Sequence, residues 1–206
     1  PGDWVEPRDE RRLAFHTAHV GRPRDVPLLP FYAAHDMPAT VFWDTFSEAQ
    51  WAKREAEYEA QRKREAELDE RTVDLLAIGE MQAERDHNVQ SEKSSAEEFN
   101  GRKLRHAWDG GWFSFDVAVP TAGDAELIVD YWGSETGPRE FDVQVDGATI
   151  ATTSLHQDAP GEFWQKSYTL PAAVLSGKPK INVRFQAKPG NYAGGVFGVR
   201  VVRPAP

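Results

Sequence analysis

Residues 79–206 alternate apolar and polar side chains in several short runs, and this pattern constrains the fold more than any other feature of the chain. Successive side chains of a strand point to opposite faces, so a period of two marks a strand with one buried face. The apolar members of the clearest runs are Phe113, Phe115, Val117 and Val119; Leu127, Val129 and Tyr131; Phe141, Val143 and Val145; Ile181, Val183 and Phe185; and Phe197, Val199 and Val201. Each run predicts one strand that faces a core.

Turn signals separate these runs. Asp146-Gly147 lies between two of them and is a strong hairpin signal, because both residues tolerate the left-handed backbone conformation. Gly123-Asp124, Ser176-Gly177 and Pro189-Gly190 mark further turns. About six to eight short antiparallel strands at this spacing predict a mainly β fold. We expect residues 79–206 to form an antiparallel β-sandwich of the jelly-roll type.

Residues 47–78 have the composition of a helix. Ser47 and Gln50 form a capping box at its start, and good helix formers fill its interior. A more apolar stretch before Gly79 predicts its end, and consists of Leu68, Val73, Leu75, Leu76 and Ile78. The apolar stripe is thin, so this charged linker helix is predicted to lie on a surface or between domains. A coiled-coil dimer is the alternative, but residues 53–67 lack apolar a and d positions.

Residues 1–46 are rich in proline, which disfavours helix. Thr40-Val41-Phe42-Trp43 predicts one short strand, and the segment supplies few partners for it. We expect residues 1–46 to be the remnant of an upstream β-sandwich. Apolar side chains between residues 28 and 43 would then be covered by the rest of the chain or by self-association, since an unpaired strand edge favours pairing between copies.

Composition excludes several classes of function. The chain contains no cysteine, so it has no thiolate nucleophile, disulfide or cysteine-bound zinc. A formal net charge of −9 argues against a nucleic-acid partner, and no apolar run approaches the ~20 residues that span a membrane. His16 and His19 are three residues apart, but flanking prolines disfavour the helix that would bring them to one metal ion. We expect no metal and no other cofactor.

The seven tryptophans are the strongest indication of a binding site. Trp132 lies on the opposite strand face from Tyr131 and is predicted to point away from the core, while other aromatic residues fall near turns. Outward aromatic rings beside an arginine can stack against the apolar C–H face of a sugar. The candidate carbohydrate-binding residues are Trp132, Arg139, Trp164 and Tyr192. The alternative is that these rings cover an interface with another domain.

A dense polar cluster precedes the alternating runs and consists of Glu80, Glu84, Asp86 and His87. Paired carboxylates can catalyse glycoside hydrolysis when they flank the sugar, but one short segment does not supply both sides of a cleft. We therefore interpret the cluster as structural, either satisfying buried backbone groups or fixing the entry to the domain. No catalytic residue is predicted.

Several motifs occur in an order similar to that of bacterial β-L-arabinofuranosidase-type glycoside hydrolases. Near residues 31–43 the chain resembles the end of the first β-sandwich of that family. Further on it resembles the terminal module, through motifs such as Arg105-x-x-Trp108-x-x-Gly111-Trp112, Tyr131-Trp132-Gly133 and Gly194-Gly195-Val196-Phe197. The resemblance spans residues 28–202, with a charged linker helix between the two parts.

The resemblance implies a C-terminal, non-catalytic region of a glycoside hydrolase, with a terminal β-sandwich of unknown function. In that family an upstream helical toroid carries a cysteine nucleophile and a zinc ion, so no catalytic residue transfers to this chain and it is not expected to be an enzyme. Our main hypothesis is an accessory region that braces the catalytic domain of the same parent chain. The alternative is a carbohydrate-binding module with glycans as partners. The family resemblance favours a periplasmic or secreted location.

Overall fold

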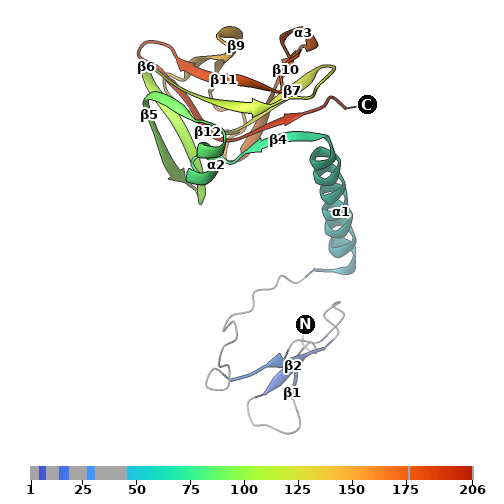
Figure 1. Cartoon of the computed structure of the whole chain (residues 1–206). Helices are drawn as coiled ribbons and strands as arrows, with labels where there is room; N and C mark the ends of the chain where they lie inside the picture. The colour runs from blue at the N-terminus through green and yellow to red at the C-terminus, as the bar shows by residue number, and fades with distance from the viewer. Residues whose placement is uncertain (1–4, 8–13, 19–26, 31–45, 176, 206) are drawn as a thin grey trace. The chain divides into compact units, whose positions relative to one another are not determined.

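The computed structural model describes residues 5–7, 14–18, 27–30, 46–175 and 177–205 (Figure 1). The chain divides into two compact units, Pro1–Ala56 and Glu57–Pro206. The first unit contains three short antiparallel strands in the order β1-β2-β3, namely β1 (Val5–Pro7), β2 (Phe15–Thr17) and β3 (Pro27–Leu28). They are too short to show alternation, so the sequence did not predict them. The strand predicted at residues 40–43 lies outside the described residues.

Helix α1 (Glu48–Arg71) begins where the capping box predicts. The main-chain N–H of Ser47 donates to Oε1 of Gln50 over 2.9 Å, and the N–H of Gln50 donates to Oγ of Ser47 over 3.3 Å. The predicted capping box is therefore confirmed. All residues of α1 are described and none is buried, in agreement with the thin apolar stripe.

The second unit holds the sandwich. Its strands pair antiparallel in the order β10-β7-β12-β6-β11-β8-β9, with β4 on β12 and β5 on β6. The strands are β4 (Thr72–Leu76), β5 (Gln90–Phe99), β6 (Arg102–Ala118), β7 (Ala125–Trp132), β8 (Glu140–Val145), β9 (Ala148–Ser154), β10 (Phe163–Leu170), β11 (Lys180–Ala187) and β12 (Tyr192–Val202). Two short helices, α2 (Met81–Asp86) and α3 (Ala172–Leu175), interrupt the series.

Strand β6 belongs to both layers of the sandwich. Its residues 105–108 pair with β12, and its residues 112–118 pair with β11. Between the two stretches Asp109 and Gly110 have φ values of 48° and 74°, a left-handed conformation that turns the strand from one layer into the other. One layer therefore contains β10, β7, β12 and β4, and the other contains β11, β8 and β9 (Figure 1).

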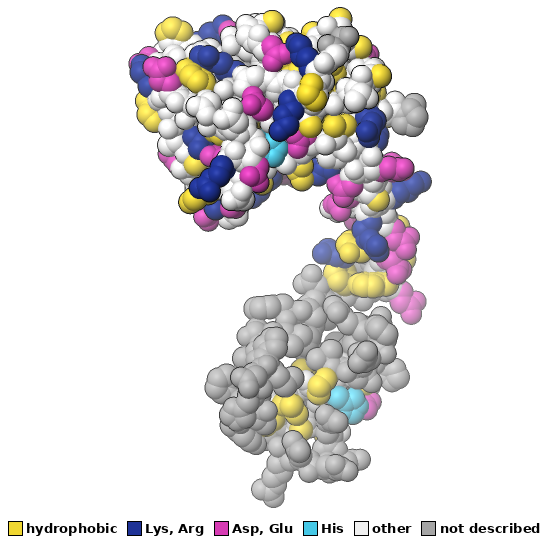
Figure 2. All heavy atoms as spheres, viewed as in Figure 1, with side chains coloured by type: hydrophobic (Ala, Val, Ile, Leu, Met, Phe, Trp, Pro, Cys, Tyr) yellow, Lys and Arg dark blue, Asp and Glu magenta, His cyan; other side chains and the backbone are white. Residues whose placement is uncertain are grey.

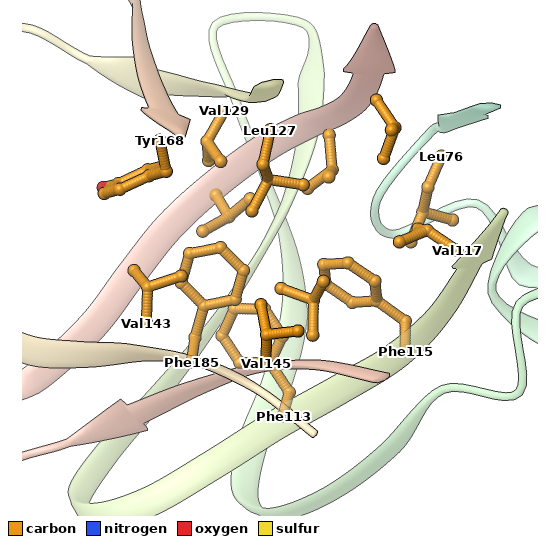
Figure 3. Packing of buried hydrophobic residues seen from close by; sticks show 14 of the residues in the cluster. Leu76, Phe113, Phe115, Val117, Leu127, Val129, Val143, Val145, Tyr168 and Phe185 are labelled. Carbon is orange, nitrogen blue, oxygen red and sulfur yellow. The ribbon is translucent and has the colours of Figure 1, made fainter. Parts of the chain in front are cut away.

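The core lies between these layers (Figure 3). Side chains of β7, among them Leu127 and Val129, face side chains of β6, β8 and β11. The rings of Phe113 and Phe185 stack with centroids 5.1 Å apart and an interplanar angle of 12°. Every residue predicted to face inward in the first four alternating runs is buried. The predicted antiparallel β-sandwich is confirmed.

The fifth run, in β12, is only partly as predicted. Val199 and Val201 belong to the core, together with Val196. Phe197 lies on the opposite face, where its ring centroid is 4.9 Å from that of Phe163. The register between β12 and β7 shifts between Val196 and Gly198, and such a bulge changes the face to which the next side chain points. Alternation in the sequence does not reveal the bulge.

The predicted helix to residue 78 is wrong beyond Arg71. Thr72–Leu76 form strand β4 instead, and Leu76 pairs with Val199 of β12. The hydroxyl of Thr72 donates to the carbonyl oxygen of Leu68 over 2.7 Å and so satisfies a carbonyl at the helix end. Leu76 and Ile78 are almost fully buried. Their burial, with the β-branched Thr72 at the junction, outweighs the weak local preference for helix.

Among the described residues, no helix combines the length and the apolar character that crossing a membrane requires.

Candidate functional site

Trp132 and Trp164, two of the four predicted binding residues, lie on opposite faces of the β7–β10 pair. Trp164 stands opposite Tyr131 in the register, and Trp132 stands opposite Phe163. Because Tyr131 is fully buried, Trp164 is turned toward the core, with the two ring centroids 5.9 Å apart. Trp132 faces outward, and its ring centroid lies 5.0 Å from that of Phe163 and 5.3 Å from that of Phe99. The two tryptophans therefore do not form one site.

Arg139 and Tyr192, the other two predicted residues, do lie together. The guanidinium carbon of Arg139 is 5.5 Å from the centroid of the Tyr192 ring. Nε of Arg139 lies 2.7 Å from a carboxylate oxygen of Glu135, and Nη1 donates to the carbonyl oxygen of Gly194 over 2.7 Å. Gly194 has φ of 89°, and a Cβ there would lie 2.8 Å from the carbonyl oxygen of Arg105. Glycine is thus needed to bring this part of β12 against β6.

The sequence did not indicate His106 and Trp108, which complete this site from β6. Trp108 stands directly opposite Tyr192 across the β6–β12 pair, so both rings lie on one face. The ring centroid of His106 is 5.9 Å from each of them, with interplanar angles of 79° and 75°. Trp108 is 38% exposed and Tyr192 is 41% exposed. We call His106, Trp108 and Tyr192 the aromatic platform.

The alternation of Leu104, His106 and Trp108 along β6 was the available signal. Ala107 is buried on the inner face of this stretch. On the other face, exposure increases from the buried Leu104 to the exposed Trp108, next to the turn at Asp109. What the sequence does not show is that β6 pairs with β12, more than eighty positions further along the chain, which adds Tyr192 to the same face.

His106 is held by polar groups of β5. Its Nε2 lies 3.1 Å from the hydroxyl oxygen of Ser95 and 3.4 Å from a carboxylate oxygen of Glu97. Burial lowers the pKa of His106; the carboxylate of Glu97 opposes this, while the positive charges of Arg139 and Arg105 add to it. The net pKa is below the ordinary value of 6.5. The ring is therefore mostly neutral at pH 7.

Glu135 balances the charge of Arg139 next to the platform. Burial raises the pKa of Glu135 above its ordinary value, against the opposing effects of the Arg139 guanidinium and the main-chain N–H of Gly195. The site therefore combines two half-exposed aromatic rings, a largely neutral imidazole, a compensated ion pair and a nearby carboxylate. Flat rings of this kind bind an apolar molecular face, and the surrounding groups can hydrogen-bond to hydroxyls.

The predicted polar cluster lies elsewhere, around α2. Glu84 accepts hydrogen bonds from the main-chain N–H of Gly79 over 2.8 Å and from Nε of Arg105 over 2.9 Å. Glu80 lies 2.9 Å from Nζ of Lys103. These contacts join the segment that follows β4 to β6.

The remaining members of the cluster have similar partners. His87 has Nδ1 2.7 Å from the carbonyl oxygen of Ala83 and Nε2 3.1 Å from Oδ1 of Asp74. The other carboxylate oxygen of Asp74 accepts the main-chain N–H of Ala118 of β6 over 2.6 Å. Asp86 accepts a hydrogen bond from Gln82 over 2.8 Å. Glu80, Glu84 and His87 thus connect this segment to neighbouring parts of the fold, whereas the contact of Asp86 lies within α2.

Within the described residues no metal site is found, and on the face shown in Figure 2 no patch of one charge stands out. The described part of the chain holds no group of three or more His, Asp or Glu side chains that could bind a metal ion. Figure 2 shows acidic and basic side chains interspersed over the sandwich and along α1 on the face in view. With a net charge of −9, the chain offers no basic surface there for phosphates.

The fold is that of a class of β-sandwich found among carbohydrate-binding modules. The family 35 carbohydrate-binding module from Clostridium thermocellum matches with a TM-score of 0.50 and 16% identity, over 64% of this chain and 100% of that chain. A family 35 carbohydrate-binding module from an environmental isolate matches with a TM-score of 0.49 and 12% identity, over 65% of this chain and 98% of that chain. An exo-β-1,3-galactanase from Phanerochaete chrysosporium matches at 0.45 and 15% identity, over 55% of this chain and 27% of that chain. At such identities the likeness defines the fold alone.

Residues 67–202 match a family of unknown function, DUF6805, and the chain belongs to that family. No curated protein matches. The match begins near the end of α1 and includes β4, so the family spans the whole sandwich rather than only the part after Gly79.

Proposed function

We propose that the sandwich is a non-catalytic carbohydrate-binding module and that the aromatic platform is its binding site. The observation that carries the proposal is the pair of half-exposed rings, Trp108 and Tyr192, directly opposite each other on one sheet face. A sugar ring has an apolar C–H face that such rings can cover, at little entropic cost because they turn about few bonds. The sandwich fold supports the proposal, since carbohydrate-binding modules share it.

The polar surroundings suit the same ligand. Ser95, Glu97 and His106 offer a hydroxyl, a carboxylate and an imidazole beside the platform. Sugar hydroxyls both donate and accept hydrogen bonds, so these groups can fix the orientation of a ring stacked on Trp108. Aromatic stacking would then supply affinity, and the polar groups would supply selectivity.

Binding to polysaccharides in native affinity gels, followed by calorimetry with oligosaccharides, tests the proposal. Trp108→Ala and Tyr192→Ala should each weaken binding at least about tenfold, equal to about 1.4 kcal/mol, because tryptophan and tyrosine are enriched among the interface residues whose truncation costs most. Tyr58→Ala is the matched control, since Tyr58 of α1 is 62% exposed and far along the chain from the platform. Retained binding in both platform variants, with unchanged melting curves, would refute the site.

A second candidate function is the bracing of a catalytic domain, and α1 favours it. Trp51 is 50% exposed and Tyr58 is 62% exposed on a helix without a buried residue. The ring of Phe46 lies 6.0 Å from that of Trp51. Exposed aromatic groups on a helix are typical of a contact with another protein surface. Replacing Trp51 and Tyr58 with alanine would then lower the melting temperature of the intact parent protein but not that of this chain.

We further propose that the parent protein is a glycoside hydrolase of the β-L-arabinofuranosidase type, located in the periplasm or secreted. The order of the motifs in the sequence supports this proposal. None of the three similar structures described above is a β-L-arabinofuranosidase. The chain itself would hydrolyse no glycoside, because covalent hydrolysis in that family needs a thiolate and this chain has no cysteine. Turnover of aryl β-L-arabinofuranosides by two independent preparations of this chain would contradict that expectation, and the sequence upstream of residue 1 tests the parentage.

A further inference from the structure

Charged groups around the aromatic platform are paired before any ligand arrives. Arg139 lies 2.7 Å from the carboxylate of Glu135. Lys93, which is near the turn after Trp108, donates to the carbonyl oxygen of Asp109 over 3.1 Å and lies 3.4 Å from its carboxylate. A ligand carboxylate would have to compete with Glu135 or Asp109 for either cation.

The remaining charge beside the platform is negative. Glu97 is opposite Leu104 in the β5–β6 register, so it shares the outer face of His106. Its side chain is 56% exposed, its carboxylate accepts a hydrogen bond from the Ser95 hydroxyl over 3.2 Å, and it lies 3.4 Å from Nε2 of His106. Because the pKa of His106 is lowered, the imidazole does not neutralise Glu97 at pH 7. A second carboxylate near Glu97 would be repelled, and repulsion between like charges at short range is weakened but not abolished by water.

A neutral sugar meets none of these costs. Its hydroxyls can donate to the carboxylate of Glu97, and a hydrogen bond to a charged acceptor is stronger than one between neutral groups. We infer that the aromatic platform selects uncharged glycans over uronic-acid glycans, and that Glu97 is a specificity-determining residue. This inference rests on the proposed function.

A matched pair of ligands tests it: a galacturonan oligosaccharide and the same oligosaccharide after its C6 carboxylates are reduced to neutral hydroxymethyl groups. Calorimetry at pH 7 should give the neutral form a dissociation constant at least about tenfold lower, a factor equal to about 1.4 kcal/mol. If the carboxyl-reduced oligosaccharide, which is a galactan, does not bind, a second pair is used: a neutral xylan oligosaccharide and one that bears glucuronate.

Glu97→Gln removes the negative charge and keeps an acceptor oxygen. The anionic oligosaccharide should then bind more tightly, and the ratio between the dissociation constants of the anionic and neutral forms should fall severalfold. Glu98→Gln is the control, because Glu98 is the next residue of β5 and points to the other face. If Glu97→Gln left this ratio of dissociation constants unchanged, the specificity role assigned to Glu97 would be overturned.

Two other outcomes separate the inference from the proposed function. Tighter binding of an anionic glycan, lost in Tyr192→Ala, would overturn the inference while the carbohydrate site stands. If no glycan of either pair, and no polysaccharide in the affinity gels, binds in a manner that depends on Trp108 or Tyr192, both fail.

Discussion

Aromatic side chains serve two purposes in this sandwich, and the face of the strand decides which. Phe185 lies in the core, with its ring 5.1 Å from that of Phe113 and 5.9 Å from that of Phe141. Phe99, on the outer face, is 42% exposed, and its ring centroid lies 5.3 Å from that of Trp132 in an edge-to-face arrangement. The same chemical group therefore stabilises the fold in one place and covers a surface in the other.

Phe185→Ala should destabilise the protein by about 3–5 kcal/mol, because it removes a buried ring and leaves a cavity among the rings of Phe113, Phe115 and Phe141. Phe99→Ala should cost much less, since that ring is already partly in water. Urea unfolding followed by circular dichroism measures both free energies. Similar losses for the two variants would show that the outer cluster around Trp132 is as tightly packed as the core.

At the scale of elements, local sequence explains where α1 begins but not where it ends. Ser47 and Gln50 are three residues apart and fix the start by hydrogen bonds that involve only themselves. The end depends on the burial of Leu76 and Ile78 in the core and on the pairing of β4 with β12, a strand far along the chain. Helix preference acts over neighbouring residues, whereas burial is decided by the whole fold, so the sequence alone misplaced this boundary.

The contact between α2 and β6 should make stability depend on pH. Burial works to raise the pKa of Glu84, but the hydrogen bonds from Arg105 and the Gly79 N–H, with the charge of Arg105, bring it below the ordinary value of 4.5. A carboxyl group whose folded pKa is lowered stabilises the fold above its unfolded pKa, and this contribution is lost as pH falls through the folded pKa.

Glu84→Gln should therefore lower the free energy of unfolding at pH 7 by about 1–3 kcal/mol, because it replaces one of the two oxygens that accept from Arg105 and leaves the part-buried guanidinium without its counter-charge. Its stability should also fall less than that of the native chain as the pH decreases below about 4.5. Glu80→Gln, which removes a more exposed carboxylate beside Lys103, is the control and should change little. Parallel pH curves for the native chain and Glu84→Gln would contradict the assigned role.

At the scale of the whole molecule, the site is a product of topology. Alternation predicted the strands and thus the class of fold, since it needs only neighbouring residues. The platform requires β12 to return beside the first part of β6, which places Tyr192 opposite Trp108. Trp132 and Trp164 are adjacent to Tyr131 in the strand or in the register, yet they face opposite ways. A single sequence carries no information on which strands pair, so it does not show that Arg139 and Tyr192 lie together while Trp132 and Trp164 lie on opposite faces.

The sandwich domain begins earlier in the chain than the sequence predicts. The sequence places the start of the domain at residue 79, whereas β4 pairs with β12 before that point. Leu76 at the end of β4 and Ile78, two residues later, both belong to the core. Asp74 also accepts the main-chain N–H of Ala118 of β6 over 2.6 Å. A chain of residues 67–206 should therefore melt at the same temperature as the full chain. A chain of residues 79–206 should have a free energy of unfolding that is lower by more than the cost of losing one buried leucine, which is about 2–5 kcal/mol. Its β12 edge should also be open to pairing between copies. Thermal melts and light scattering measure both effects, and equal stability of the two truncated chains would show that β4 adds nothing to the fold.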